Sequence, residues 1–290
     1  MESKLKTHLW EILNSHLTAT ESEWLLSKLE SKPLDQMTAF VAAPRFLSKK
    51  IVEPTAVQLA DLQLSLPGFN VSGWSLVRLA RVWIAGNFKA ETPEEYVKNI
   101  ETLFNTAEMN ELVALYSALP VLEYPEKWIG RATDAVRSNM GIVFDAIAMN
   151  NPFPSMHFSE LAWNQLVMKT IFNDKPIHMI YGLEAHANAD LALIVSDFAH
   201  ERWAAGRQIA PEIWRLVTNF LSDRHIEDLK TLLSSSKPYQ PEAGALVCFL
   251  SKNEEALQLL KEYPELERRV SSGELTWSHL EFKELNTYVS

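Results

Sequence analysis

The feature that most constrains the fold is a succession of amphipathic stretches separated by prolines. Within each stretch, apolar residues recur every three or four positions, which places them on one face of an α-helix. A proline ring blocks the hydrogen bonding of a helix interior, so prolines favour the joins between helices. The prolines at the predicted joins are Pro33, Pro120, Pro125, Pro152, Pro154, Pro176, Pro211, Pro238, Pro241 and Pro264.

The first predicted helix covers residues 2–17. Thr20 and Glu23 predict a capping box for a second helix, and Thr92 with Glu95 predicts another helix start. Further helices are expected near residues 34–46, 108–119, 125–138, 141–149, 158–172, 189–205, 211–222, 225–235, 241–251 and 253–261.

The composition favours helices over strands. The chain has nine glycines in 290 residues, and its long stretches are rich in Leu, Ala, Glu and Lys, which are good helix formers. Runs of β-branched residues and hairpin turns with Gly or Asn are absent. We therefore predict an all-α fold, an irregular α-α superhelix or solenoid of stacked helical pairs. Since no strict internal period is present, a compact irregular bundle is the alternative.

Residues 47–72 are the least regular part of the sequence, with Pro54, Pro67 and Gly68. A break there predicts an N-terminal helical unit, residues 1–50, packed on a main helical body, residues 51–290.

The charge balance argues against a nucleic-acid-binding protein. The 27 basic and 37 acidic side chains give a net charge of −10, which disfavours nucleic-acid binding because phosphate backbones are repelled.

The single cysteine, Cys248, lies in an apolar run and is predicted to be a small core residue. We expect no cleaved signal sequence and no transmembrane segment, because no stretch reaches about 18 apolar residues. A cytoplasmic location follows, with residues 1–17 as an amphipathic segment able to lie against the inner membrane.

The helix predicted at 158–172 is apolar nearly all round, yet it carries polar side chains. His157, Glu160 and Asn164 fall within about 60° of one another at the helical period. Buried polar groups need partners, since unpaired burial is costly. Three interpretations stay open: contacts to neighbouring helix ends, a ligand pocket, or a catalytic acid or base.

The helix predicted at 189–205 presents an acidic stripe. Asp190, Asp197 and Glu201 lie on one side, and His200 lies beside them. A solvated acidic face explains this pattern. Alternatively, Asp197, His200 and Glu201 line a groove opposite the polar residues of the preceding helix.

Basic residues and histidines in the same region raise the questions of an anion site and of a metal site. Arg202 and Arg207 are expected to serve the helix C-terminus, or alternatively to clamp a phosphate or carboxylate. A zincin helix needs a second histidine at position 204, which is alanine. We predict no metal and no other cofactor, because zinc needs three or four convergent ligands and no Gly-rich nucleotide loop is present. The histidines considered are His157, His178, His186 and His200.

Several strings within residues 151–220 are distinctive together, and with them the chain resembles the EboA family. The match is sharp over about a quarter of the chain, and elsewhere a helical run of suitable length is compatible with it. The strings are Asn151-Pro152-Phe153, Glu160-Leu161-Ala162-Trp163-Asn164-Gln165, Gly182-Leu183-Glu184, Ala187-Asn188, the run from Ala199 to Arg207, and Pro211-Glu212-Ile213-Trp214-Arg215.

The resemblance implies a role in metabolite traffic. EboA-like proteins are encoded with a UbiA-like membrane prenyltransferase, a sugar-phosphate-cyclase-like enzyme and TIM-barrel proteins, in clusters linked to moving a secondary-metabolite precursor out of the cytoplasm. The implied partners are those proteins or a small hydrophobic metabolite. No catalytic residue is carried over, so the pocket candidates are binding residues: His157, Glu160, Asn164, Asp197, His200, Glu201, Arg202 and Arg207.

Two functional hypotheses result, and whether the protein is an enzyme stays open. The preferred hypothesis is a non-catalytic binding or adaptor protein on the cytoplasmic side of an export system, because stacked helices offer an extended surface. The alternative is an enzyme acting on a prenylated or aromatic precursor, with Glu160 or His200 as acid or base.

Overall fold

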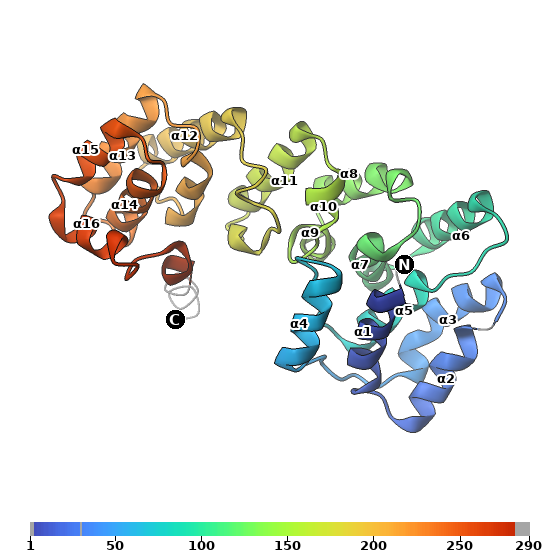
Figure 1. Ribbon diagram of the computed structural model, residues 1–290. Helices are drawn as coiled ribbons and strands as arrows, with labels where there is room; N and C mark the ends of the chain where they lie inside the picture. Colours follow the sequence, from blue (N-terminus) through green and yellow to red (C-terminus); the bar gives the residue numbers. More distant parts are fainter. Residues whose placement is uncertain (1–2, 30, 282–290) are drawn as a thin grey trace. The chain divides into compact units, whose positions relative to one another are not determined.

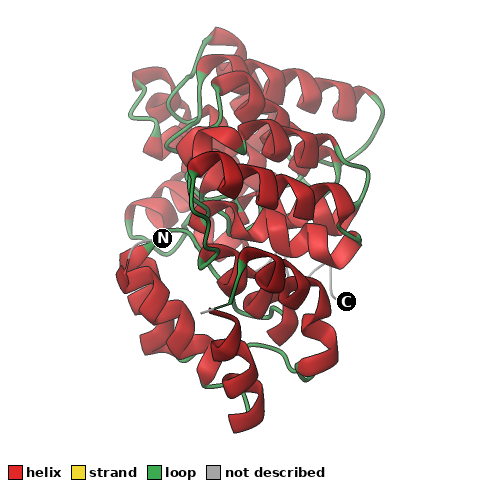
Figure 2. Cartoon of the chain, turned by 90° about the vertical axis from the view of Figure 1, so that its right-hand side faces the viewer, coloured by secondary structure: helices red, strands yellow, loops and turns green. Residues whose placement is uncertain are grey.

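The computed structural model describes residues 3–29 and 31–281, which form helices joined by short turns (Figure 2). Ile51 and Ser75 form an isolated antiparallel bridge, and these residue ranges contain no β-strand. The prediction of an all-α fold is therefore confirmed. Among the helices described, none has the combination of length and apolar content that crossing a membrane requires.

The chain divides into two compact units, residues 1–162 and 163–290. The predicted boundary near residue 50 falls inside the first unit, and a separate unit of residues 1–50 stays a prediction. Of the predicted body, residues 282–290 lie outside the described residues. Figure 1 labels the helices along the chain.

The first unit contains α1 (Ser3–Asn14), α2 (Ala19–Leu29), α3 (Pro33–Phe46), α4 (Ala56–Ser65), α5 (Leu76–Gly86), α6 (Pro93–Thr106), α7 (Met109–Ala118), the 3-10 helices η1 (Leu119–Val121) and η2 (Pro125–Lys127), α8 (Ile129–Arg137), α9 (Gly141–Ala148) and α10 (Phe153–His157). Helix α11 (Glu160–Phe172) begins at the end of this unit. The second unit continues with η3 (Ile177–Met179), α12 (Ala189–Ala204), η4 (Pro211–Val217), α13 (Asp223–Leu233), α14 (Gln240–Leu250), α15 (Glu254–Leu260) and α16 (Pro264–Ser271).

Helix α5 is the centre of the first unit. It packs against α1, α3 and α7, and α7 packs in turn against α9. Every residue from Leu79 to Gly86 is buried, so this helix has no solvated face along that stretch. Burial on all sides identifies an interior helix.

Helix starts show how closely local sequence determines structure. Thr92 caps α6 as predicted, because its hydroxyl accepts a hydrogen bond from the Glu95 N–H at 3.1 Å. The capping box of α2 is displaced from the predicted Thr20 and Glu23: Thr18 and Glu21 form it instead. Glu21 also accepts from the Ser48 N–H at 2.6 Å, a contact between distant residues that favours this earlier start.

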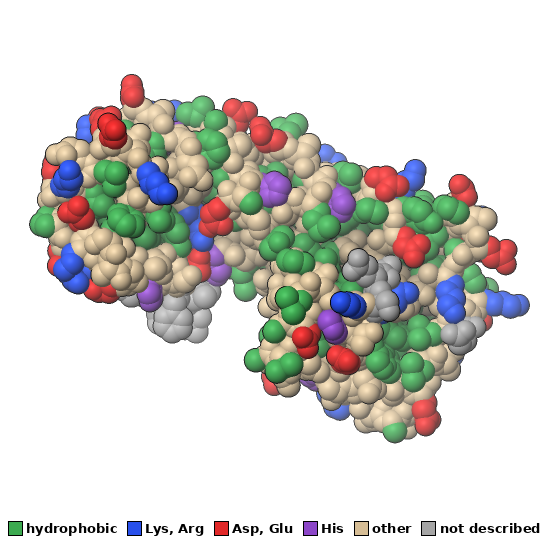
Figure 3. Space-filling model, in the orientation of Figure 1, with side chains coloured by type: hydrophobic (Ala, Val, Ile, Leu, Met, Phe, Trp, Pro, Cys, Tyr) green, Lys and Arg blue, Asp and Glu red, His purple; other side chains and the backbone are tan. Residues whose placement is uncertain are grey.

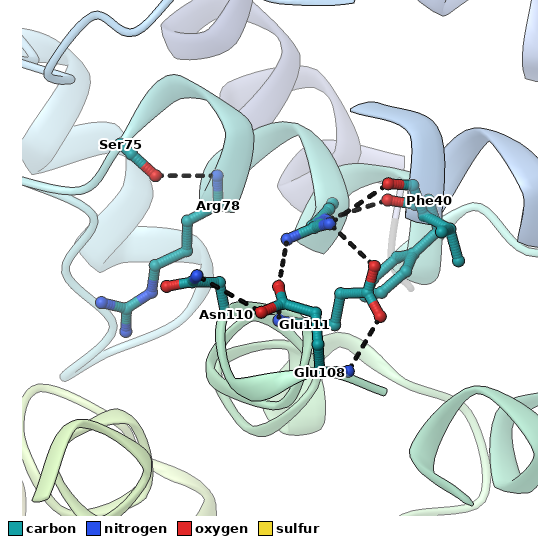
Figure 4. A network of polar contacts seen from close by, with 8 residues as sticks. Phe40, Ser75, Arg78, Glu108, Asn110 and Glu111 are labelled. Carbon is teal, nitrogen blue, oxygen red and sulfur yellow. Dashed lines mark hydrogen bonds and ion pairs between the residues drawn. The ribbon is translucent and has the colours of Figure 1, made fainter. Parts of the chain in front are cut away.

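A buried arginine joins three helices of the first unit. Arg81, on α5, is 3% exposed. Its Nε donates to the Phe40 carbonyl of α3 at 2.9 Å, and its Nη2 donates to Glu111 of α7 at 3.0 Å. Burial lowers the pKa of Arg81, and the nearby Glu111 and Glu108 oppose that shift. Figure 4 shows Phe40, Glu108 and Glu111 around this network.

The second unit is organised around α14, which packs against η4, α13, α15 and α16. Gly244 allows the close approach of α13, because a Cβ there would lie 3.0 Å from the Leu232 Cβ. Cys248 on the same helix is fully buried, and burial raises the pKa of its thiol to about 12. It is a core residue, as the sequence predicts.

We predict that Arg81→Met lowers the free energy of unfolding by about 3–5 kcal/mol, because Glu111 loses its buried cationic partner. Urea denaturation followed by circular dichroism measures this loss. Arg137→Met is the matched control: Arg137 pairs with Asp134 on the surface of the same unit, and its loss should cost about 1 kcal/mol or less. Equal losses in the two variants would contradict a structural role for the buried network.

Candidate functional site

Two of the predicted pocket residues lie in the first unit. His157 is half-buried with its ring centroid 4.6 Å from that of Phe153, and burial lowers the pKa of its imidazole. Glu160 is exposed at the first residue of α11, where the helix dipole favours a carboxylate, so it does not need a buried partner. Asn164 and His200 belong to the second unit, and a hollow shared by all four residues stays a prediction.

Asn164 has a structural contact within the second unit. It forms a reciprocal pair with Asn188: each side-chain amide donates to the other, at 3.2 and 2.8 Å. Asn188 in turn caps α12 by accepting from the Leu191 N–H at 2.8 Å. Asn164 thus fixes the start of the next helix, in agreement with the first of the three interpretations of this polar group.

The acidic stripe of α12 faces solvent. Asp190, Asp197 and Glu201 are all exposed, and Asp197 pairs with Arg224 at 2.5 Å. On the face visible in Figure 3, acidic and basic side chains are interspersed rather than gathered in one continuous area. These positions match the interpretation of a solvated acidic face.

His200 is held by a buried carboxylate. Its Nε2 lies 2.5 Å from Oδ1 of Asp228, whose side chain is 2% exposed while that of His200 is 47% exposed. The other oxygen of Asp228 accepts from the Ser196 hydroxyl at 2.6 Å. This arrangement links α12 to α13 and orients the imidazole.

A cavity of about 160 Å³ lies in the second unit, beside the C-terminal ends of α11 and α12. Ile171 comes from α11, and Phe198 and Arg202 come from α12, so both helices border this cavity. The residues that line this cavity differ from the predicted pocket residues. Of the eight predicted residues, Arg202 is among those that line it. The other lining residues are Asp174, Lys175, Pro176, Ile177, His178, Gln208, Ala210, Glu212, Ile213 and Glu281.

A hydrogen-bonded pair of His178 and Glu212 forms the polar end of this cavity. Nδ1 of His178 lies 2.8 Å from one oxygen of Glu212, and the other oxygen accepts from the Ile177 N–H at 3.1 Å. The hydrogen bond to Glu212 raises the pKa of His178, and partial burial opposes this rise. The contact with Glu212 therefore favours the protonated form of the His178 imidazole.

The same end contains atoms of the type that bind metals. One ligand atom from each of His178, Glu212 and Glu281 lies within 4.8 Å of the others. Arg215 pairs with Glu281 and, at 2.5 Å, with Glu184. Because Arg215 and His178 already pair with these carboxylates, the cluster is an ion-pair network. A divalent ion would have to displace Arg215 or the proton of His178.

The sequence does not identify His178 and Glu212 as a pair. His178 is one of four histidines in its region and Glu212 belongs to a family string, but no pattern links the two residues across 34 positions. A glutamate directly after Pro211 at the start of a predicted helix is an ordinary first-turn residue. Its 4% exposure, which marks it as unusual, comes from tertiary packing.

We predict that the pair stabilises the fold most at mildly acidic pH. Because the folded-state pKa of His178 is raised above the unfolded value of about 6.5, this stability is complete below that value and is lost as the pH rises through the folded pKa. His178→Gln should therefore cost about 1–3 kcal/mol at pH 6 and less at pH 9. Urea denaturation at both pH values measures the difference. His279→Gln, at an exposed histidine, should show no such trend, and a cost for His178→Gln that does not fall with pH would refute the assignment.

Comparison with known proteins identifies a family to which the sequence is similar. Residues 5–218 match the family model described as metabolite traffic protein EboA, a range that includes His178 and Glu212. The comparison with curated proteins found no match, and neither did the comparison with solved structures. Since the matched range covers more than half of the 290 residues, the chain belongs to the EboA family.

Proposed function

We propose that this protein is a non-catalytic binding protein in metabolite traffic, and that it holds a small ring-sized molecule in the cavity bounded by Ile171, Phe198 and Glu212. The size of the cavity carries this proposal. An apolar protein cavity of roughly 150 Å³ accommodates benzene. At about 160 Å³, the present cavity is large enough for one such ring.

The lining suggests the chemistry of the ligand. Ile171, Phe198 and Ile213 provide apolar walls, and Glu212 with His178 provides hydrogen-bonding groups at one end. Small-molecule sites commonly combine mainly apolar walls with a few placed polar groups that fix orientation. A ring bearing one hydroxyl or amine suits this combination better than a purely apolar ring.

The adaptor part of the proposal rests on the family. Its description as a metabolite traffic protein supports a role in passing a molecule between proteins rather than converting it. We extend this to the partners that the resemblance implies, a membrane prenyltransferase, a cyclase-like enzyme and TIM-barrel proteins, and to the cytoplasmic side of an export system for a secondary-metabolite precursor.

Filling the cavity should abolish binding of a probe. We expect p-cresol to bind the wild type in saturation-transfer NMR, and toluene to bind more weakly because it lacks the hydroxyl. Ala210→Phe places a ring in the cavity and should weaken p-cresol binding at least about tenfold, a loss of roughly 1.4 kcal/mol.

Ala185→Phe is the matched control, since Ala185 is exposed in the same unit and does not line the cavity. It should bind p-cresol as the wild type does. Equal p-cresol binding by Ala210→Phe and the wild type would refute this cavity as the ligand site.

A second candidate function is supported by one observation, the contact of His200 with Asp228. A buried carboxylate that orients an exposed imidazole through one ring nitrogen leaves the other nitrogen available as a general base. This contact favours the alternative hypothesis of an enzyme acting on a prenylated or aromatic precursor. Glu160, the other proposed acid or base, is exposed and belongs to the first unit.

His200→Gln separates the two functions. For an enzyme, we expect conversion of extracted precursors to fall by about 100-fold or more while p-cresol binding is unchanged. For a binding protein, we expect the wild type to leave the extracted precursors unconverted. The His200→Gln variant should then bind the same ligand as the wild type. Liquid chromatography with mass spectrometry detects both outcomes, and turnover that depends on His200 would overturn the non-catalytic proposal.

A further inference from the structure

A second cavity in the second unit has a positively charged lining. It measures about 240 Å³ and lies beside the C-terminal end of α12 and the N-terminal end of α14. Its lining includes Arg207, Lys237 and Gln240, together with the ring of Trp203 and the hydroxyl-bearing Thr231 and Ser235. No carboxylate is among the lining residues in the described part of the chain.

Both cations of this cavity lack an ionic partner. Among residues 3–29 and 31–281, the side chains of Arg207 and Lys237 form no ion pair or hydrogen bond. Other basic side chains of the unit, such as Arg215 and Arg224, do pair with carboxylates. In a chain with a net charge of −10, two unpaired cations on one cavity form a local site for an anion.

A buried acceptor provides independent evidence for a ligand. Gln240 is 6% exposed, and its Nε2 donates to the Ile209 carbonyl at 2.8 Å, which fixes the orientation of the amide. Its Oε1 is buried without a partner. A buried acceptor of this kind costs free energy unless a donor reaches it, and Gln240 is one of the residues that line the cavity.

The neighbouring arginine, Arg202, is already engaged. Its Nε and Nη2 both donate to the Gln208 carbonyl, at 3.0 and 2.9 Å. Of the two arginines for which the sequence suggested an anion clamp, the structure therefore leaves Arg207 available. Lys237, which comes from a different part of the chain, takes the place of Arg202 as its counterpart.

We propose that this second cavity binds the phosphate monoester group of a small molecule. The two positive charges match a phosphate monoester, which carries between one and a half and two negative charges at neutral pH. The first turn of α14 adds the favourable end of the helix dipole, and its acidic residue, Glu242, is already paired with Arg269 at 3.6 Å. A hydroxyl of the phosphorylated ligand donates to the free oxygen of Gln240.

This site differs from the first cavity in charge and in lining, so it goes beyond the proposed binding of a ring-sized molecule. Gln208 lines both cavities, which makes it their common wall. Separate variants distinguish the two proposals: Ala210→Phe should leave phosphate binding intact, and Arg207→Gln should leave p-cresol binding intact.

The test uses the full chain and isothermal titration calorimetry at low ionic strength, with inorganic phosphate, glycerol phosphate and succinate as probes. We expect glycerol phosphate to bind the wild type with a Kd of roughly 1 mM or below. Inorganic phosphate should bind more weakly because it has no alcohol hydroxyl to donate to the Oε1 of Gln240. Arg207→Gln and Lys237→Gln should each weaken binding about tenfold. Added salt should weaken it as well.

Lys261→Gln is the matched control. It removes one exposed positive charge of the same unit, and its nearest described partner is the amide of Gln258. Its affinity for glycerol phosphate should equal that of the wild type. Three results would each overturn the proposal: no heat of binding with either phosphate, tighter binding of succinate than of glycerol phosphate, or equal weakening by Lys261→Gln and Arg207→Gln.

Discussion

The turn that follows α12 is held by two side chains that donate to its carbonyl groups, and both cavities depend on it. Arg202 binds the Gln208 carbonyl with two N–H groups, and Gln240 binds the carbonyl of Ile209. A turn after a helix has carbonyls that no helical N–H reaches, and leaving them unpaired in a partly buried position is costly. The two side chains satisfy that need and position Gln208 between the cavities.

The conformation of this turn also explains its sequence. Gly206 has φ +68°, a left-handed conformation that glycine adopts without steric cost at a helix C-terminus. The Arg207 N–H donates to the Arg202 carbonyl at 2.8 Å, which closes the end of the helix. Arg202, before this turn, lines the first cavity, and Arg207, directly after Gly206, lines the second.

Local patterns in the sequence were sufficient for the helices but not for their partners. Periodicity and prolines predicted the all-α fold, and Thr92 was placed correctly because a helix cap depends on residues three positions apart. The start of α2 was misplaced, since Glu21 is selected by a contact to Ser48 that lies far along the chain. The buried Arg81 was not foreseen for the same reason: its acceptors lie on two other helices.

The candidate site shows this limit more sharply. A helical wheel grouped Asn164 with His157 and Glu160, but it could not show that His157 belongs to α10 or that Asn164 pairs with Asn188. The wheel also assumed that α11 is buried all round, whereas Leu161 is 81% exposed and Phe172 is 61% exposed. The residues that form the cavity come from two helices, from the segments after them and from the distant Glu281, and no periodic pattern connects these parts of the chain.

The state of the polar groups bears on the choice between binding and catalysis. Each oxygen of Glu212 accepts one hydrogen bond, from Ile177 or His178, which holds the carboxylate in place and leaves a second lone pair on each oxygen. His200 has a free ring nitrogen, but it is not among the residues that line either cavity in the described ranges. A ligand in the first cavity would therefore meet a carboxylate that is fixed in place and can still accept a hydrogen bond from it. This separation of the first cavity from His200 supports the proposed binding role.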